Sequence, residues 1–231
     1  MPFVEIATGS ALGALLGMRH ALEPDHLAAV TTLVSDERSS WRAMMLGVCW
    51  GLGHTIALVV VGVGLILLRA EMPPRVADLF ELGVAVMLVG LGIRAIVRAA
   101  REGGQGPSAT HAHRGVVHHH AGVPQHVHMG RFTLARRPLL IGIVHGLAGS
   151  GALTALVLAT LPTAAARITY MTLFGLGSSV GMAALSGLLG WPLTRLDQQG
   201  RALRTVSLVV GLVSTGLGIA WGAPLVSRLV G

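Results

Sequence analysis

Two imidazoles and two carboxylates lie close together in an otherwise apolar stretch of the sequence, at His20, Glu23, Asp25 and His26. His20, Asp25 and His26 offer two nitrogen donors and one oxygen donor, a set that suits a borderline divalent transition metal such as nickel, cobalt or zinc. Ionisable groups are costly inside hydrocarbon unless they are paired, hydrated or functional. We therefore predict that these three residues bind a metal ion, over the alternative that Arg19 merely pairs with Glu23 or Asp25.

The spacing of these residues requires a break in the helix that carries them. On a continuous helix, Asp25 lies about 140° and His26 about 240° around the axis from His20, so the three side chains could not share one ligand. Pro24 lacks a backbone N–H and forces the preceding residue out of helical conformation. We predict an unwound stretch around Leu22–Pro24 that lets the three side chains converge and frees carbonyl groups to line a cavity.

Two further histidines lie in apolar segments elsewhere in the chain. His54 follows a glycine in the next apolar segment and is predicted to add a third imidazole, whereas His145 is predicted to line the metal path. A single hydrogen bond between helices would also account for each of them, because polar side chains often join membrane helices in this way. Four other polar residues are candidates for the pathway: Glu23, Thr55, Ser150 and Ser178.

The composition of the whole chain indicates an integral membrane protein. Of its 231 residues, 52% are apolar and only 12% charged, with a mean hydropathy of +0.70. Soluble domains carry about 25% charged residues. This composition excludes a soluble enzyme and a disordered chain, and the single cysteine excludes a disulfide scaffold. The positive net charge of +7 comes from arginines clustered between apolar runs, which favours orientation in a membrane over nucleic-acid binding.

Six segments are long and apolar enough to cross a bilayer as helices, so we predict an all-α membrane protein. Short motifs recur in order between the two halves, as in Gly17–Leu22 and Gly142–Leu147, at an offset near 125 residues. Three spans per half then make a 3+3 inverted repeat, with the first helix broken near Pro24. The predicted spans are 4–34, 43–68, 77–97, 138–161, 168–190 and 205–227. The predicted units are a first repeat at 1–98, a connecting segment at 99–137 and a second repeat at 138–231.

The connecting segment is rich in glycine and histidine, without apolar periodicity, and reads as a flexible loop. Its histidines either collect metal ions or simply belong to a solvated linker. Arginines are more frequent on the side of this loop, so the positive-inside rule predicts a cytoplasmic loop and two external termini in a bacterial cytoplasmic membrane. The seven histidines are His111, His113, His118, His119, His120, His126 and His128.

The stretch from His20 to His26 resembles the signature of the nickel/cobalt transporter family, a histidine, four residues, then aspartate and histidine. Leu52-Gly53-His54-Thr55 is similar to that family's second signature, and Gly142–Gly151 resembles its short branch of urease-accessory-type nickel permeases. The resemblance implies transport of Ni²⁺, or of Co²⁺, as cargo through a protein without a resident cofactor. It also implies the lipid bilayer as a partner and a cytoplasmic nickel chaperone as a further one.

Three functions remain open at this point. The first is a secondary permease: no Walker-type loop exists in a chain without lysine, and protonation of imidazoles would assist metal release. The second is a metal exporter of the same superfamily. The third is an accessory protein that donates nickel to a soluble partner through its histidine loop. An intramembrane serine protease is not expected, because no histidine follows His145 to act as base for Ser150.

Overall fold

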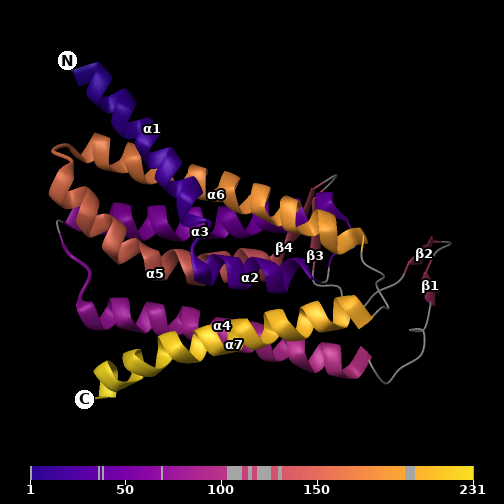
Figure 1. The fold of residues 1–231 in the computed structure, drawn as a ribbon. Coiled ribbons are helices and arrows are strands. Elements are labelled where there is room, and N and C mark those ends of the chain that lie inside the picture. The colour runs from indigo at the N-terminus through magenta and orange to yellow at the C-terminus, as the bar shows by residue number, and fades with distance from the viewer. Residues whose placement is uncertain are drawn as a thin grey trace.

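The computed structural model describes residues 2–35, 37, 39–68, 70–102, 111–113, 116–118, 126–129, 132–195 and 201–230. Helices make up nearly all of this part of the chain, and they lie side by side in one bundle (Figure 1). Both termini lie toward the same end of the bundle, and the short strands lie toward the opposite end. The helices are α1 (Pro2–His20), α2 (Pro24–Val34), α3 (Ser40–Leu68), α4 (Pro74–Glu102), α5 (Arg136–Thr160), α6 (Ala164–Arg195) and α7 (Arg201–Val230).

Four of these helices are long and apolar enough to cross a membrane. They are Ser40–Leu68, Pro74–Arg101, Ala164–Pro192 and Ala202–Val230, within α3, α4, α6 and α7. Large apolar side chains on them face outward, as with Val60, Val86, Leu188 and Val213, all of which are exposed. Several histidines and serines are buried instead. Outward apolar and inward polar side chains suit a lipid environment, so the chain is a helical membrane protein.

The first apolar segment is broken where the proline predicts it. α1 ends at His20, and α2 begins at Pro24, which occupies its first turn. Glu23 caps α2 in an extended conformation, with φ −66° and ψ 150°. The peptide N–H of Leu22 donates to the carbonyl of Arg19 at 2.9 Å, which closes a tight turn between the two helices. The prediction of a break near Pro24 is therefore in agreement with the backbone.

The two halves of the chain pack against each other through antiparallel helix pairs. α3 lies against α6, and α4 lies against α7. Small residues permit the close approach: a methyl group added at Gly53 would overlap the carbonyl oxygen of Leu139 in α5, and one added at Gly177 would overlap that of Ala14 in α1. Glycine is the residue that lets membrane helices approach backbone to backbone.

The histidine-rich connection contains short strands that its composition does not predict. β1 (His111–His113) pairs with β2 (Val116–His118), and β3 (His126–Met129) pairs with β4 (Phe132–Ala135), both antiparallel. Five of the seven histidines lie in these strands, and His119 and His120 lie outside the described residues. The division of the chain at 99 and 137, and metal binding by this segment, remain predictions.

Candidate metal centre

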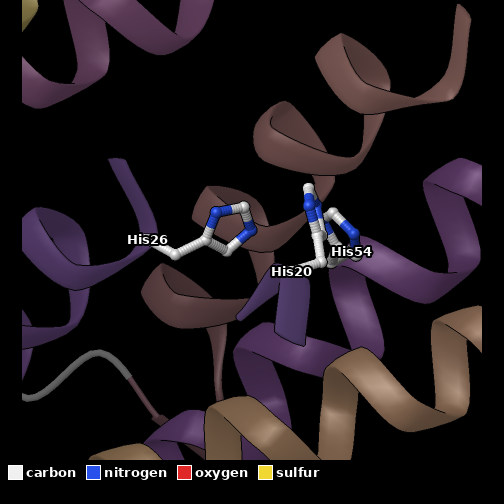
Figure 2. A group of neighbouring side chains, drawn as sticks. All are labelled: His20, His26 and His54. Carbon is white, nitrogen blue, oxygen red and sulfur yellow. The ribbon is translucent and has the colours of Figure 1, made fainter. Parts of the chain in front are cut away.

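Three histidines from three helices converge beside the break in the first apolar segment. His20 is the last residue of α1, His26 lies in the first turn of α2, and His54 lies midway along α3. One ligand nitrogen of each lies within 4.8 Å of the others. The ring of His26 faces the rings of His20 and His54 across a short gap (Figure 2), with ring centroids 4.5 and 5.6 Å away. The broken helix therefore brings together residues that a continuous helix would separate.

The nitrogens of this group are the right kind of atoms to hold a cation. His26 and His54 are almost completely buried, while His20 is partly exposed. Within the described part of the chain, neither ring nitrogen of His54 has a hydrogen-bond partner, and neither does Nε2 of His26. Buried polar atoms normally have hydrogen-bond partners, so buried nitrogens without partners indicate a place where a ligand binds. A divalent metal fits, because neutral imidazole is a common ligand of transition metals.

Two carboxylates fix the orientation of two of these rings. Nδ1 of His20 lies 3.0 Å from Oε1 of Glu23, and Nδ1 of His26 lies 3.1 Å from Oδ1 of Asp25. An ionised carboxylate only accepts hydrogen bonds, so each Nδ1 carries the proton and each Nε2 keeps its lone pair. Metal-binding histidines are commonly held this way, with the second nitrogen donating to a carboxylate. Glu23 and Asp25 thus prepare the two imidazoles for a cation.

Asp25 also joins the first half of the chain to the second. Its Oδ2 lies 2.9 Å from Nε2 of His145 in α5, and both residues are buried. The imidazole of His145 lies against that of His26, with ring centroids 4.2 Å apart. Asp25, His26 and His145 form a second group whose ligand atoms all lie within 4.8 Å of one another. The carboxylate predicted as a direct ligand thus lies between two imidazoles.

Sequence reasoning missed Trp50, which forms one wall of the centre. Its indole stacks on the ring of His26 at 5.4 Å and lies 5.6 Å from that of His145. The residue is fully buried, and its Nε1 has no hydrogen-bond partner in the described chain. A signal was available: Trp50 precedes His54 by four residues, so both lie on one face of α3.

The remaining predicted pathway residues lie at helix contacts. Thr55 donates its hydroxyl to the carbonyl of Gly175 at 2.7 Å and lies 2.9 Å from the hydroxyl of Ser179. Ser178 is buried and donates to the carbonyl of Gly17 at 3.1 Å. Ser150 lies in α5, and its side chain falls outside the described residues, as do the side chains of the loop histidines. Thr55 and Ser178 therefore link helices, and a role in the pathway remains a prediction for both.

Comparison with known proteins shows the family to which the chain belongs. Residues 8–220 match the high-affinity nickel-transport protein family, which covers nearly the whole chain. The chain belongs to this nickel-transport family. The resemblance found in the signature from His20 to His26 is therefore confirmed, together with a nickel-related role in a membrane.

Three known proteins are similar in sequence to this chain over most of its length. The chain is 34% identical over 220 residues to "Urease accessory protein UreH" of Bacillus sp. (strain TB-90), covering 95% of this chain and 92% of the relative. It is 25% and 27% identical to "Chloroplast protein FOR GROWTH AND FERTILITY" 2 and 1 of Arabidopsis thaliana, over 94% and 92% of this chain. It spans only 56% and 58% of those two plant proteins. No solved structure matches the chain significantly.

Proposed function

We propose that this protein is a secondary permease that carries Ni²⁺, and with lower preference Co²⁺, across the bacterial cytoplasmic membrane. The observation that supports it most is the convergence of three imidazoles, from His20, His26 and His54. Two of them, His26 and His54, carry buried nitrogens that have no partner among the described residues. Membership of the nickel-transport family supports nickel as the cargo. Buried ionisable residues in a membrane protein mark ion pathways, because they are too costly to retain for packing alone.

We also propose that the six-span arrangement is a 3+3 inverted repeat. Reciprocal contacts support it: a methyl group at Gly17 would overlap the carbonyl oxygen of Phe174, and one at Gly142 would overlap that of Trp50. Gly142 follows Gly17 by 125 residues, and Phe174 follows Trp50 by 124. Call the residue about 125 positions away in the other half the counterpart of a given residue. If two residues are in contact and their counterparts are in contact too, the two halves are related by a two-fold axis.

Residues near such an axis should contact their own counterparts, and two pairs do. The hydroxyl of Ser214 donates to the carbonyl of Leu88 at 2.9 Å, across an offset of 126 residues. Thr55 and Ser179 lie 2.9 Å apart across an offset of 124. Inverted repeats bind their substrates near the membrane midplane at the interface between the repeats, as the imidazole centre would.

Transport can be tested with the purified full-length chain in liposomes under an imposed pH gradient and without ATP. We expect nickel flux well above that of protein-free liposomes, and flux near that background for His20→Ala, His26→Ala and His54→Ala. Thr32→Val is the matched control, because this buried threonine donates only to the carbonyl of Ala28 in its own helix, at 2.8 Å. Wild-type flux in all three histidine variants would refute the site.

A second function, a nickel donor to a soluble partner, is favoured by the relative named as a urease accessory protein and by the histidine-rich connection. Deleting residues 108–129 separates the two functions, since this segment lies outside the helices. A permease should keep most of its nickel flux, whereas a donor should lose nickel delivery to a chaperone.

We also propose, from the distribution of arginines, that the histidine-rich connection lies on the cytoplasmic side of the membrane. Labelling of a His118→Cys variant by a reagent that reaches only the cytoplasmic side would test this orientation.

A further inference from the structure

A second buried donor set lies directly beside the three-imidazole centre and shares one residue with it. Asp25, His26 and His145 present a carboxylate oxygen and two imidazole nitrogens within 4.8 Å of one another. Asp25, His26 and His145 are buried, with at most 8% of any one exposed. His145 comes from α5, in the second half of the chain, whereas the other two come from α2.

We propose that this second set is a separate position for the transported cation, made of two imidazoles and one carboxylate. The proposal builds on the proposed transport function and names the next step of the path. The ion first occupies the centre of His20, His26 and His54 and then passes across the ring of His26 to a position held by Asp25 and His145. A mixed nitrogen and oxygen donor set of this kind suits divalent nickel and cobalt.

The two positions cannot both be occupied, because they share the ring of His26. A neutral imidazole has one lone pair at a time, on Nδ1 or on Nε2. In the structure, Nδ1 of His26 faces Asp25 at 3.1 Å, and Nε2 has no partner among the described residues. Nε2 is therefore free for the first position, while Nδ1 serves the second only after its proton has moved to Nε2.

His145 is arranged in the same way. Its Nε2 faces Asp25 at 2.9 Å, and its Nδ1 is buried without a partner in the described part of the chain. When the cation replaces the two N–H contacts to Asp25, the displaced protons move to Nε2 of His26 and Nδ1 of His145. No proton is gained or lost by the protein, and the proton now on Nε2 of His26 closes the first position behind the ion.

The second position can be isolated by removing the first. In the double variant His20→Gln/His54→Leu, glutamine and leucine fill the volume of the two lost imidazoles. Of the two donor sets, only the second then retains two imidazoles. The triple variant with His145→Ala added keeps the histidine-rich connection, so it reports any nickel bound there. X-ray absorption at the nickel edge counts the imidazoles around the ion, and equilibrium dialysis counts ions per chain in detergent-solubilised, full-length protein.

We expect one more nickel ion per chain in the double variant than in the triple variant, surrounded by two imidazoles. His145→Ala alone should keep the three-imidazole ion but lose nickel flux. Equal nickel in the double and triple variants would overturn the second position, as would wild-type flux in His145→Ala. Failure of the transport function looks different: wild-type protein would give no flux, while the double variant would still bind its ion.

Thr32→Val, introduced alone, controls for changes in packing near α2, and it should leave both the ion count and the flux unchanged. Elution of each variant as a single species, with the helical circular dichroism of the wild type, establishes that it folds. If the double variant does not fold, wild type and His145→Ala are compared instead with bound Co²⁺. Part of the cobalt in the wild type should then have two imidazoles and a carboxylate as ligands, which His145→Ala cannot provide, and identical cobalt spectra would overturn the proposal.

Discussion

Replacing His54 with leucine should stabilise the metal-free protein, although it removes a central residue of the site. His54 is fully buried, and both of its ring nitrogens lack partners within the described residues. Leaving a buried polar group unpaired costs about 1–3 kcal/mol. Leucine fills a similar volume without that cost, so we expect His54→Leu to raise the free energy of unfolding by about 1–3 kcal/mol in the presence of a chelator.

Ser178, which the proposed repeat pairs with His54, provides a control for which the expected change has the opposite sign. Its hydroxyl donates to the carbonyl of Gly17 at 3.1 Å, so Ser178→Ala removes a bond that is made. Polar contacts between membrane helices contribute about 0.6 kcal/mol on average, and Ser178→Ala should lower the free energy of unfolding by about that amount. The two substitutions therefore separate an unpaired buried group from a paired one.

Nickel should reverse the order of the wild type and the leucine variant. A ligand at about 1,000 times its dissociation constant stabilises the folded state by about 4.1 kcal/mol, and only the protein with His54 would gain this in full. Denaturant titration in detergent, followed by circular dichroism with and without nickel, measures both effects. The reasoning would be refuted if His54→Leu destabilised the chelated protein as Ser178→Ala does, because His54 would then already have a partner.

Other expectations rest on single contacts. Gly142→Ala should lower the free energy of unfolding by about 1–3 kcal/mol in the same titration, because the added methyl meets the backbone of Trp50. Gly64→Ala is the control: Gly64 has open space around it, so the free energy of unfolding should change by less than about 0.5 kcal/mol. Glu23→Gln should weaken nickel binding about 10-fold in calorimetry, because it loosens the hold on Nδ1 of His20, and unchanged affinity would show that Glu23 does not orient the ring. With the exposed Trp41, Trp191 and Trp221 changed to phenylalanine, nickel should quench the fluorescence of Trp50, and His26→Ala should remove that quenching.

Much of the centre could be predicted from the sequence because local chemistry determines it. Pro24 cannot donate a backbone hydrogen bond to the last turn of α1, and this favours a break there that brings His20 close to His26. The apolar length of α3 and the glycines around His54 likewise predict a buried imidazole. These features depend on covalent geometry and on the cost of burying polar groups, which are the same wherever the segment lies.

Contacts between distant segments could not be predicted in this way. Periodicity shows which face of a helix is buried, but not which residue of another helix lies opposite it. The bond from Asp25 to His145 joins residues 120 positions apart, and the sequence indicated only that both were candidates. The strands between residues 111 and 135 were missed for another reason: each is only three or four residues long, too short for an alternation of polar and apolar residues to stand out.

The proposed inverted repeat would duplicate the scaffold of this centre but not its donors, and that asymmetry bears on how an ion could move. His145 stands at the repeat position of His20, and Phe174 stands at the repeat position of Trp50. The ring of Phe174 lies 5.3 Å from that of His20, and the ring of Trp50 lies 5.6 Å from that of His145. The carboxylate has no such copy, since the residue 125 positions after Asp25 is a serine. Inverted repeats work largely by rocking one half against the other. Because most donors here belong to the first half, such rocking would carry the ion with that half and change its contact with His145, the donor from the second half.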